Sequence, residues 1–168
     1  ARDLSSHEAM VHNLNTMNSR AGAQVPFSSV NYGTDTTPAG RLVTRMLLKA
    51  TEDGLGNGET PIFPVQIFKT KQGINLDPED PNYDLFKQAI ATSAKRLFPN
   101  FSFLDAPFNA QYYREGDHDS EVAYMGCRTR VMANVNDRDR EVTCGRGNLS
   151  FTSINLPRIG IEARADLD

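Results

Sequence analysis

The feature that most constrains the fold is an alternation between short apolar stretches and longer amphipathic ones. The short stretches are rich in β-branched and aromatic residues and occupy residues 24–31, 62–70, 101–104, 121–126 and 149–155. The longer stretches carry apolar residues at helical spacing and occupy residues 6–19, 38–51 and 83–97. Strands separated by helices of roughly a dozen residues are typical of β-α-β units, whose strands run parallel. The sequence therefore predicts an α/β fold with a parallel sheet or barrel.

The first helix is expected to begin near Ser5. Ser5 and Glu8 have the spacing of a capping box, in which two side chains satisfy the free N–H groups of a helix start. One face of this helix should be buried, because apolar residues recur along it at helical spacing. That predicted stripe consists of Met10, Val11, Leu14 and Met17.

Prolines mark the expected limits of other elements. Thr37 followed by Pro38 is typical of a capping residue and a first helical turn. Pro99 should close the third helix. Pro64 lies within the second expected strand and favours an edge strand or a bulge, because proline cannot donate to a strand ladder. A further helix is expected to begin near Ile161.

Composition limits the classes of function. The 168 residues fit a single segment of one domain, and 39% hydrophobic with 23% charged side chains is typical of a globular protein. The net charge of −3 gives no support for nucleic-acid binding by bulk electrostatics. No apolar run reaches the roughly 18 residues that a membrane span needs, and no targeting segment is visible. We therefore expect a cytoplasmic protein with no membrane and no direct nucleic-acid partner.

Two loops have the composition of ligand-binding loops but not the required spacing. Residues 54–60, GLGNGET, lack the Gly-Lys-Ser/Thr ending of a phosphate loop and precede a strand instead of following one. A second loop is acidic, without the spacing or the glycine of an EF-hand. Its acidic residues are Asp77, Glu79, Asp80 and Asp84. We interpret the first as a helix terminator and the second as a solvated turn, and we expect no metal site.

The last expected strand has a polar face. Alternation places Asn148, Ser150 and Thr152 on one side and apolar residues on the other. In an α/β barrel the apolar side would meet helices, and the polar side would face a lumen that binds a hydroxylated ligand. Gly-Asn pairs also form turns, so a simple turn at Asn148 stays open.

Cys127 ends another expected strand, directly before Arg128 and close to Arg130. Neighbouring positive charge favours a thiolate, which suits redox or radical chemistry. Most free cysteines are small buried hydrophobes, so an inert role also stays open. A disulfide with Cys144 is possible, but sequence spacing does not predict it.

Five segments of the chain carry a family resemblance. They are FSSVNYGTD at 27–35, GNGETPIFP at 56–64, FPNFSFLD at 98–105, YMGCRTR at 124–130 and GRGNLSFTSINLP at 145–157. Together they resemble the anaerobic (class III) ribonucleoside-triphosphate reductases. The resemblance runs in order over nearly the whole chain, without large gaps.

The resemblance implies a fold and a reaction. The fold is a ten-stranded α/β barrel of the ribonucleotide reductase and glycyl radical enzyme type, built from two antiparallel halves of five parallel strands, and this chain would supply part of it. The reaction reduces ribonucleoside triphosphates to 2′-deoxyribonucleoside triphosphates anaerobically, by glycyl and thiyl radical chemistry, with formate as the expected reductant. A separate iron–sulfur activase that uses S-adenosylmethionine makes the glycyl radical on a residue outside this chain.

The resemblance also implies roles for single residues. Two cysteines flank the ribose in this family, and Cys127 matches one of them, so it is expected to be catalytic. Asn148 matches the asparagine that binds the ribose hydroxyls in formate-using members, and Ser150 is expected to line the substrate beside it. A neutral amide can donate and accept hydrogen bonds without repelling formate.

Regulation and assembly are implied as well. Residues 27–37 match the loop that relays the identity of an ATP or deoxynucleotide effector to the substrate base. The expected effector contacts are Phe27, Ser28, Ser29, Asn31, Tyr32 and Asp35. The helix before this loop matches a homodimer-interface helix. The other ribose-flanking cysteine, the glycyl-radical loop and a C-terminal zinc site have no counterpart here, so the chain alone should be inactive.

Two other interpretations remain open. One is a non-catalytic module for nucleotide-responsive regulation or dimerisation, which would use the same loop and the first helix. The other is a segment that folds but has no function of its own. Nucleotide binding by the isolated chain separates these two.

Overall fold

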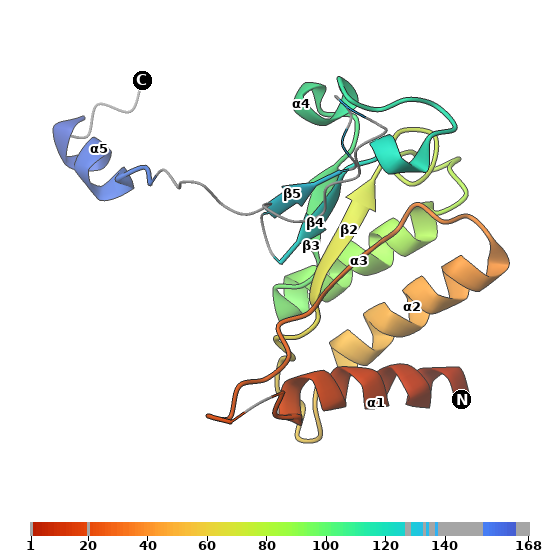
Figure 1. The fold of residues 1–168 in the computed structure, drawn as a ribbon, viewed down its shortest axis with the longest axis vertical. Coiled ribbons are helices and arrows are strands. Elements are labelled where there is room, and N and C mark those ends of the chain that lie inside the picture. The colour runs from red at the N-terminus through yellow and green to blue at the C-terminus, as the bar shows by residue number, and fades with distance from the viewer. Residues whose placement is uncertain are drawn as a thin grey trace.

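The computed structural model describes residues 2–19, 21–126, 129–132, 134, 137 and 153–163. Its elements alternate between helices and strands through most of the chain (Figure 1). The helices are α1 (Arg2–Thr16), α2 (Pro38–Asp53), α3 (Tyr83–Arg96), α4 (Pro107–Ala110), the 3₁₀ turn η1 (His118–Ser120) and α5 (Leu156–Glu162). The strands are β1 (Ser29–Tyr32), β2 (Val65–Thr70), β3 (Asn100–Phe103), β4 (Ala123–Met125) and β5 (Thr129–Val131).

The centre of the fold is a three-stranded parallel sheet in the order β1-β2-β3. Ser29 pairs with Val65 at one end of β1, and Thr70 pairs with Phe103 at the end of β3. β4 and β5 form a separate antiparallel pair. The predicted α/β fold with a parallel sheet is therefore confirmed.

The parallel sheet is covered on both faces. On one face Phe68 packs with Leu48 of α2 and Leu85 of α3, and all three side chains are fully buried. On the other face Val65 and Ile67 pack with Tyr124 of β4. β2 is therefore buried on both sides, and its buried polar side chains, Gln66 and Thr70, are hydrogen-bonded to Thr51 and to the Ser102 carbonyl oxygen.

Local signals place the ends of α2 as expected. The Thr37 hydroxyl accepts a hydrogen bond from the Gly40 N–H at 3.1 Å, and Pro38 follows as the first helical residue. Gly54 ends the helix with a φ of +83°, and a Cβ there would lie 2.7 Å from the Glu59 carbonyl oxygen. Residues 54–60 are therefore a helix terminator and turn. None of the helices in the described part of the chain is both long and apolar enough to cross a membrane.

The first helix differs from its prediction. α1 already includes Ser5, so Ser5 does not begin it, and it ends at Thr16. Val11 is buried, but Met10 and Met17 are 40% and 53% exposed. The reason is that α1 packs through Val11, which meets Leu47 and Ala50 of α2, and through the half-buried Leu14, which lies against the cluster of Phe63, Val65 and Ile67. The other half of the predicted stripe faces solvent.

Two strand predictions also need correction. The first strand is confined to residues 29–32, although it was expected from residue 24. Pro64 lies just before β2, which is the central strand, so the predicted edge or bulge at Pro64 is wrong. Because proline cannot donate to the ladder, pairing begins at the next residue.

At the C-terminal end, the predicted strand is contradicted at residues 153–155 and not tested at residues 149–152, and the helix begins earlier than expected. Residues 149–152 lie outside the described residues, and 153–155 belong to no strand. The Asn155 side chain accepts a hydrogen bond from the Arg158 N–H at 2.9 Å and begins α5 five positions before the expected start at Ile161. The Asn-Leu-Pro sequence at 155–157 combines a capping residue with a first-turn proline. The short elements α4, η1 and β5 were not predicted.

The packing around β2 predicts a strong effect of truncating Phe68. Phe68→Ala should lower the free energy of unfolding of the chain by about 3–5 kcal/mol, because a large cavity would form between the sheet and two helices. Urea unfolding followed by circular dichroism measures this change. Phe103→Ala is the matched control, because Phe103 is 58% exposed, and it should change the value by about 0.5 kcal/mol or less. Equal losses in both variants would contradict the central role of β2.

Candidate functional site

The carboxyl ends of β1, β2 and β3 lie at one edge of the parallel sheet. Ligands of open α/β sheets bind outside this edge. Three loops meet there, formed by residues 33–37, 71–82 and 104–122. The conformation of these loops decides what chemistry the edge can support.

Gly33 brings the chain after β1 unusually close to β2. Its φ is +118°, and a Cβ would lie 2.8 Å from the Lys69 carbonyl oxygen. The Gly33 carbonyl oxygen accepts a hydrogen bond from the side-chain amide of Asn75 and another from Asn82, each at 3.0 Å. Both asparagines are fully buried. Glycine is therefore needed here, and neutral amides hold the loop in place.

Asn82 extends this network to Asp35 and Arg41. It donates to the Asp35 carbonyl oxygen at 3.0 Å and accepts from the Arg41 guanidinium at 2.6 Å. Arg41 also bonds both carboxylate oxygens of Asp84, at 3.0 and 2.9 Å. Burial raises the pKa of Asp84, but the hydrogen bonds and charge of Arg41, with help from Arg45, outweigh it and lower that pKa.

Asp35 occupies the N-terminal end of α2. Its carboxylate accepts a hydrogen bond from the Thr37 backbone N–H at 2.8 Å. The backbone and then the side chain of Thr37 lower the pKa of Asp35. A carboxylate there takes the place that an external anion would have at a free helix N-terminus.

Tyr32 faces the helices. Its hydroxyl donates to the Gln66 side-chain oxygen at 2.6 Å, and the Gln66 amide donates to the Thr51 hydroxyl at 2.6 Å. Burial raises the pKa of Tyr32 well above its ordinary value, so the phenol stays neutral. Tyr32 is thus part of the interior between β1 and α2.

Ser29 and Asn31 face the opposite side of the sheet. Asn31 exchanges two hydrogen bonds of 2.8 Å with the backbone of Tyr124. The Ser29 hydroxyl accepts from the Gly126 N–H at 3.1 Å. Phe27 is 75% exposed, with its ring edge-on to Phe63 at a centroid distance of 5.1 Å. The expected effector segment therefore splits, with Tyr32 turned to the helices, Asn31 bound to β4 and Ser29 bound to Gly126 directly after it.

Of the remaining expected residues, only Ser28 is described. Its hydroxyl donates within its own loop, to the Pro26 carbonyl oxygen at 3.4 Å. Cys127, Asn148 and Ser150 lie outside the described residues, and so does Cys144. The described chain reaches Gly126, the residue directly before Cys127.

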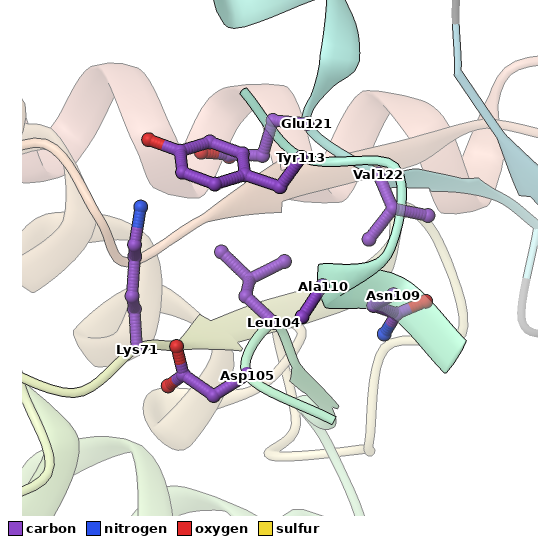
Figure 2. A pocket seen from close by; sticks show the side chains of 8 residues that line it. All are labelled: Lys71, Leu104, Asp105, Asn109, Ala110, Tyr113, Glu121 and Val122. Carbon is purple, nitrogen blue, oxygen red and sulfur yellow. The ribbon is translucent and has the colours of Figure 1, made fainter. Parts of the chain in front are cut away.

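A small cavity lies beyond the ends of β2 and β3. It measures about 40 Å³, enough for a water molecule and far too small for a nucleotide. Figure 2 shows Tyr113 and Glu121 on one side of it and Leu104 and Asp105 on the other. The Lys71 ammonium lies 3.9 Å from the centre of the Tyr113 ring. Within the described part of the chain, no three His, Cys, Asp or Glu side chains are grouped to hold a metal ion.

One ion pair beside this cavity was missed by the sequence analysis. Lys69 of β2 pairs with Glu121, and the two side chains are only 13% and 19% exposed. The sequence does contain a sign of this ion pair, because Lys69 interrupts an otherwise buried strand. Its partner lies 52 residues away and could not be identified from spacing.

Comparisons with known proteins identify relatives of the chain. The sequence model of a family described as anaerobic ribonucleoside-triphosphate reductase matches residues 5–168. The enzyme of that name from Haemophilus influenzae is 33% identical over 162 residues, which cover 96% of this chain and 22% of the relative. Those from Enterobacteria phage T4 and Escherichia coli are 33% and 31% identical and are covered over 25% and 21% of their lengths. The chain thus spans about a fifth to a quarter of these curated relatives.

The amide network predicts that Asn82 stabilises the loop after β1. Asn82→Ala should lower the free energy of unfolding by about 1–3 kcal/mol, because the buried Gly33 carbonyl oxygen would lose one of its two donors, and the Asp35 carbonyl oxygen and the Arg41 guanidinium would each lose a partner. Backbone amides of residues 34–37 should also exchange hydrogen faster. Asn57→Ala is the control, since Asn57 is exposed and its hydrogen bonds go to Glu59 in its own turn. Unchanged exchange in Asn82→Ala would contradict the proposed support.

Proposed function

Because the chain belongs to the anaerobic ribonucleoside-triphosphate reductase family, we propose that it forms part of a catalytic subunit that makes 2′-deoxyribonucleoside triphosphates from ribonucleoside triphosphates. The observation that carries this proposal is the family match over residues 5–168. The parallel α/β sheet supports it, since it offers the strand arrangement that such a barrel needs. Residues 1–168 would be one segment of the barrel domain.

The edges of the sheet are compatible with a ten-stranded barrel. In the described part of the chain, β1 and β3 pair only with β2, so each has one edge free for a further parallel strand. An uncovered strand edge favours pairing with another strand. The rest of the catalytic subunit would supply these strands and close the barrel.

The proposed reaction replaces the 2′-hydroxyl of the ribose with hydrogen. Formate supplies two electrons and becomes carbon dioxide, while the hydroxyl takes up a proton and leaves as water. A glycyl radical outside this chain, made by an iron–sulfur activase, supplies the initial radical by way of a thiyl group. Cys127 would transfer hydrogen or an electron at the ribose. Asn148 would orient the ribose hydroxyls beside Ser150, and its neutral amide would let formate approach.

Effector nucleotides would act through residues 27–35. This segment is well suited to transmit a change, because two hydrogen bonds tie Gly33 to the 71–82 loop and Asn31 is tied to β4. A homodimer would form through α1, on which Met10 is 40% exposed. A cytoplasmic location and a zinc site elsewhere in the subunit complete the proposal.

The proposal is tested with single variants of the full-length subunit. Cys127→Ala should abolish formation of deoxyribonucleotides and leave substrate binding nearly unchanged, because a sulfhydryl adds little binding energy. Asn148→Ala should weaken both, since an unpaired buried ribose hydroxyl costs about 1–3 kcal/mol. Turnover assays and equilibrium nucleotide binding measure the two effects, and Cys144→Ala is the control that should stay active.

Two results would contradict the proposal. Full deoxyribonucleotide formation by the Cys127→Ala subunit would show that Cys127 is not catalytic and would favour the inert role. Effector binding by a wild-type subunit that forms no deoxyribonucleotide after activation would favour a non-catalytic regulatory or dimerisation module.

A further inference from the structure

β1 and β4 are joined by side-chain contacts in place of a strand ladder. The Asn31 amide nitrogen donates to the Tyr124 carbonyl oxygen, and the Tyr124 N–H donates to the Asn31 side-chain oxygen, both at 2.8 Å. One side chain thus gives the backbone of Tyr124 the donor and the acceptor that a neighbouring strand would give it. The two residues are 93 positions apart in the sequence.

Ser29 adds a second contact in the same register. Its hydroxyl accepts a hydrogen bond from the Gly126 N–H at 3.1 Å. Ser29 and Asn31 are two residues apart and lie on one face of β1, and their partners, Gly126 directly after β4 and Tyr124 within it, are also two residues apart. A one-residue slip of β4 would therefore break all three hydrogen bonds.

Phe27 lies against the same segment. Gly126 has a φ of +63°, and a Cβ there would lie 3.3 Å from the Phe27 ring. The chain can therefore turn directly after β4 while the aromatic ring covers it. Three residues of the 27–31 segment thus hold the backbone that immediately precedes Cys127.

β4 depends on these contacts for its position. It is three residues long and pairs with an equally short β5, and an isolated two-stranded hairpin is at best marginally stable in water. The Tyr124 ring packs against the cluster of Phe63, Val65 and Ile67. That apolar contact holds the hairpin against the sheet, and the directional bonds of Asn31 and Ser29 set its register.

From this geometry we propose that Ser29 and Asn31 are positioning residues, which set the register of β4 and thereby the approach of Cys127 to the ribose. This inference rests on the proposed function, in which Cys127 is catalytic. Neither residue needs to touch the substrate for this role. The expected signature is a loss in the rate of turnover without a matching loss in substrate binding.

The test uses Asn31→Asp in the full-length subunit, with Asn15→Asp as the matched control. Both changes are nearly isosteric and remove an amide donor from backbone carbonyl oxygens. Asn15 binds the backbone of Ile62 and Phe63, before β2, so its loss should leave β4 in register. Asn31→Asp should lower kcat about tenfold with little change in KM, whereas Asn15→Asp should keep kcat. Ser29→Ala should lower kcat less, and Ser29→Thr should restore it by keeping the hydroxyl.

A second readout does not require turnover. The rate of Cys127 alkylation by iodoacetamide, followed across pH by peptide mass spectrometry, should change in Asn31→Asp and match the wild type in Asn15→Asp. If Asn31→Asp leaves both kcat and the alkylation profile as in the wild type, the proposal is overturned. The proposal is also overturned if Asn31→Asp and Asn15→Asp change kcat and the alkylation profile equally, in proportion to the stability that each variant loses. Asn31 would then have a merely structural role. If the wild-type subunit makes no deoxyribonucleotide, the proposed function fails, and the alkylation profiles still decide this inference.

Discussion

The burial of β2 on both faces is the constraint on which the rest of the structure depends. Phe68 faces α2 and α3, while Ile67 faces the β4 side, so neither layer can shift without exposing apolar surface. The parallel register of β1 and β3 then follows from their pairing with this one strand. Because all three strands end at the same edge, the loops that follow them are brought together there, although they come from distant parts of the sequence.

The sequence predicted those elements whose limits are set locally. α2 was expected almost as found, because Thr37, Pro38 and Gly54 act through neighbouring backbone groups, and α3 ends shortly before Pro99 as expected. Predictions failed where tertiary contacts determine which face of a helix is buried or where a strand lies in the sheet. The buried face of α1 depends on its crossing with α2, which no periodicity in α1 alone reveals. Pro64 was read as an edge signal, yet it only marks where the central strand begins.

The candidate site was less predictable than the fold, for a physical reason. Buried apolar residues recur at regular spacing in the sequence of a helix or strand. The residues that make the polar contacts at the sheet edge follow no such spacing. Asn75 and Asn82 reach Gly33 from 42 and 49 residues away, and each is one amide among several in polar loops. Glu121 is equally inconspicuous beside Lys69. Cys127, Asn148 and Ser150 came from the family resemblance, so their roles stay predictions.

Side chains of β1 point alternately to its two faces, and each face contacts a different part of the structure. Tyr32 anchors the strand to Gln66 and the helices, whereas Asn31, the adjacent residue, bonds the backbone of β4. Adjacent residues of a strand are rigidly linked, so a displacement of β1 at Gly33 must be shared by both faces. The helix side is close-packed and resists displacement, while the β4 side is a short hairpin held by three directional bonds. In the proposed function, a movement that an effector imposes on residues 27–35 would therefore be absorbed at β4, close to Cys127 in the sequence.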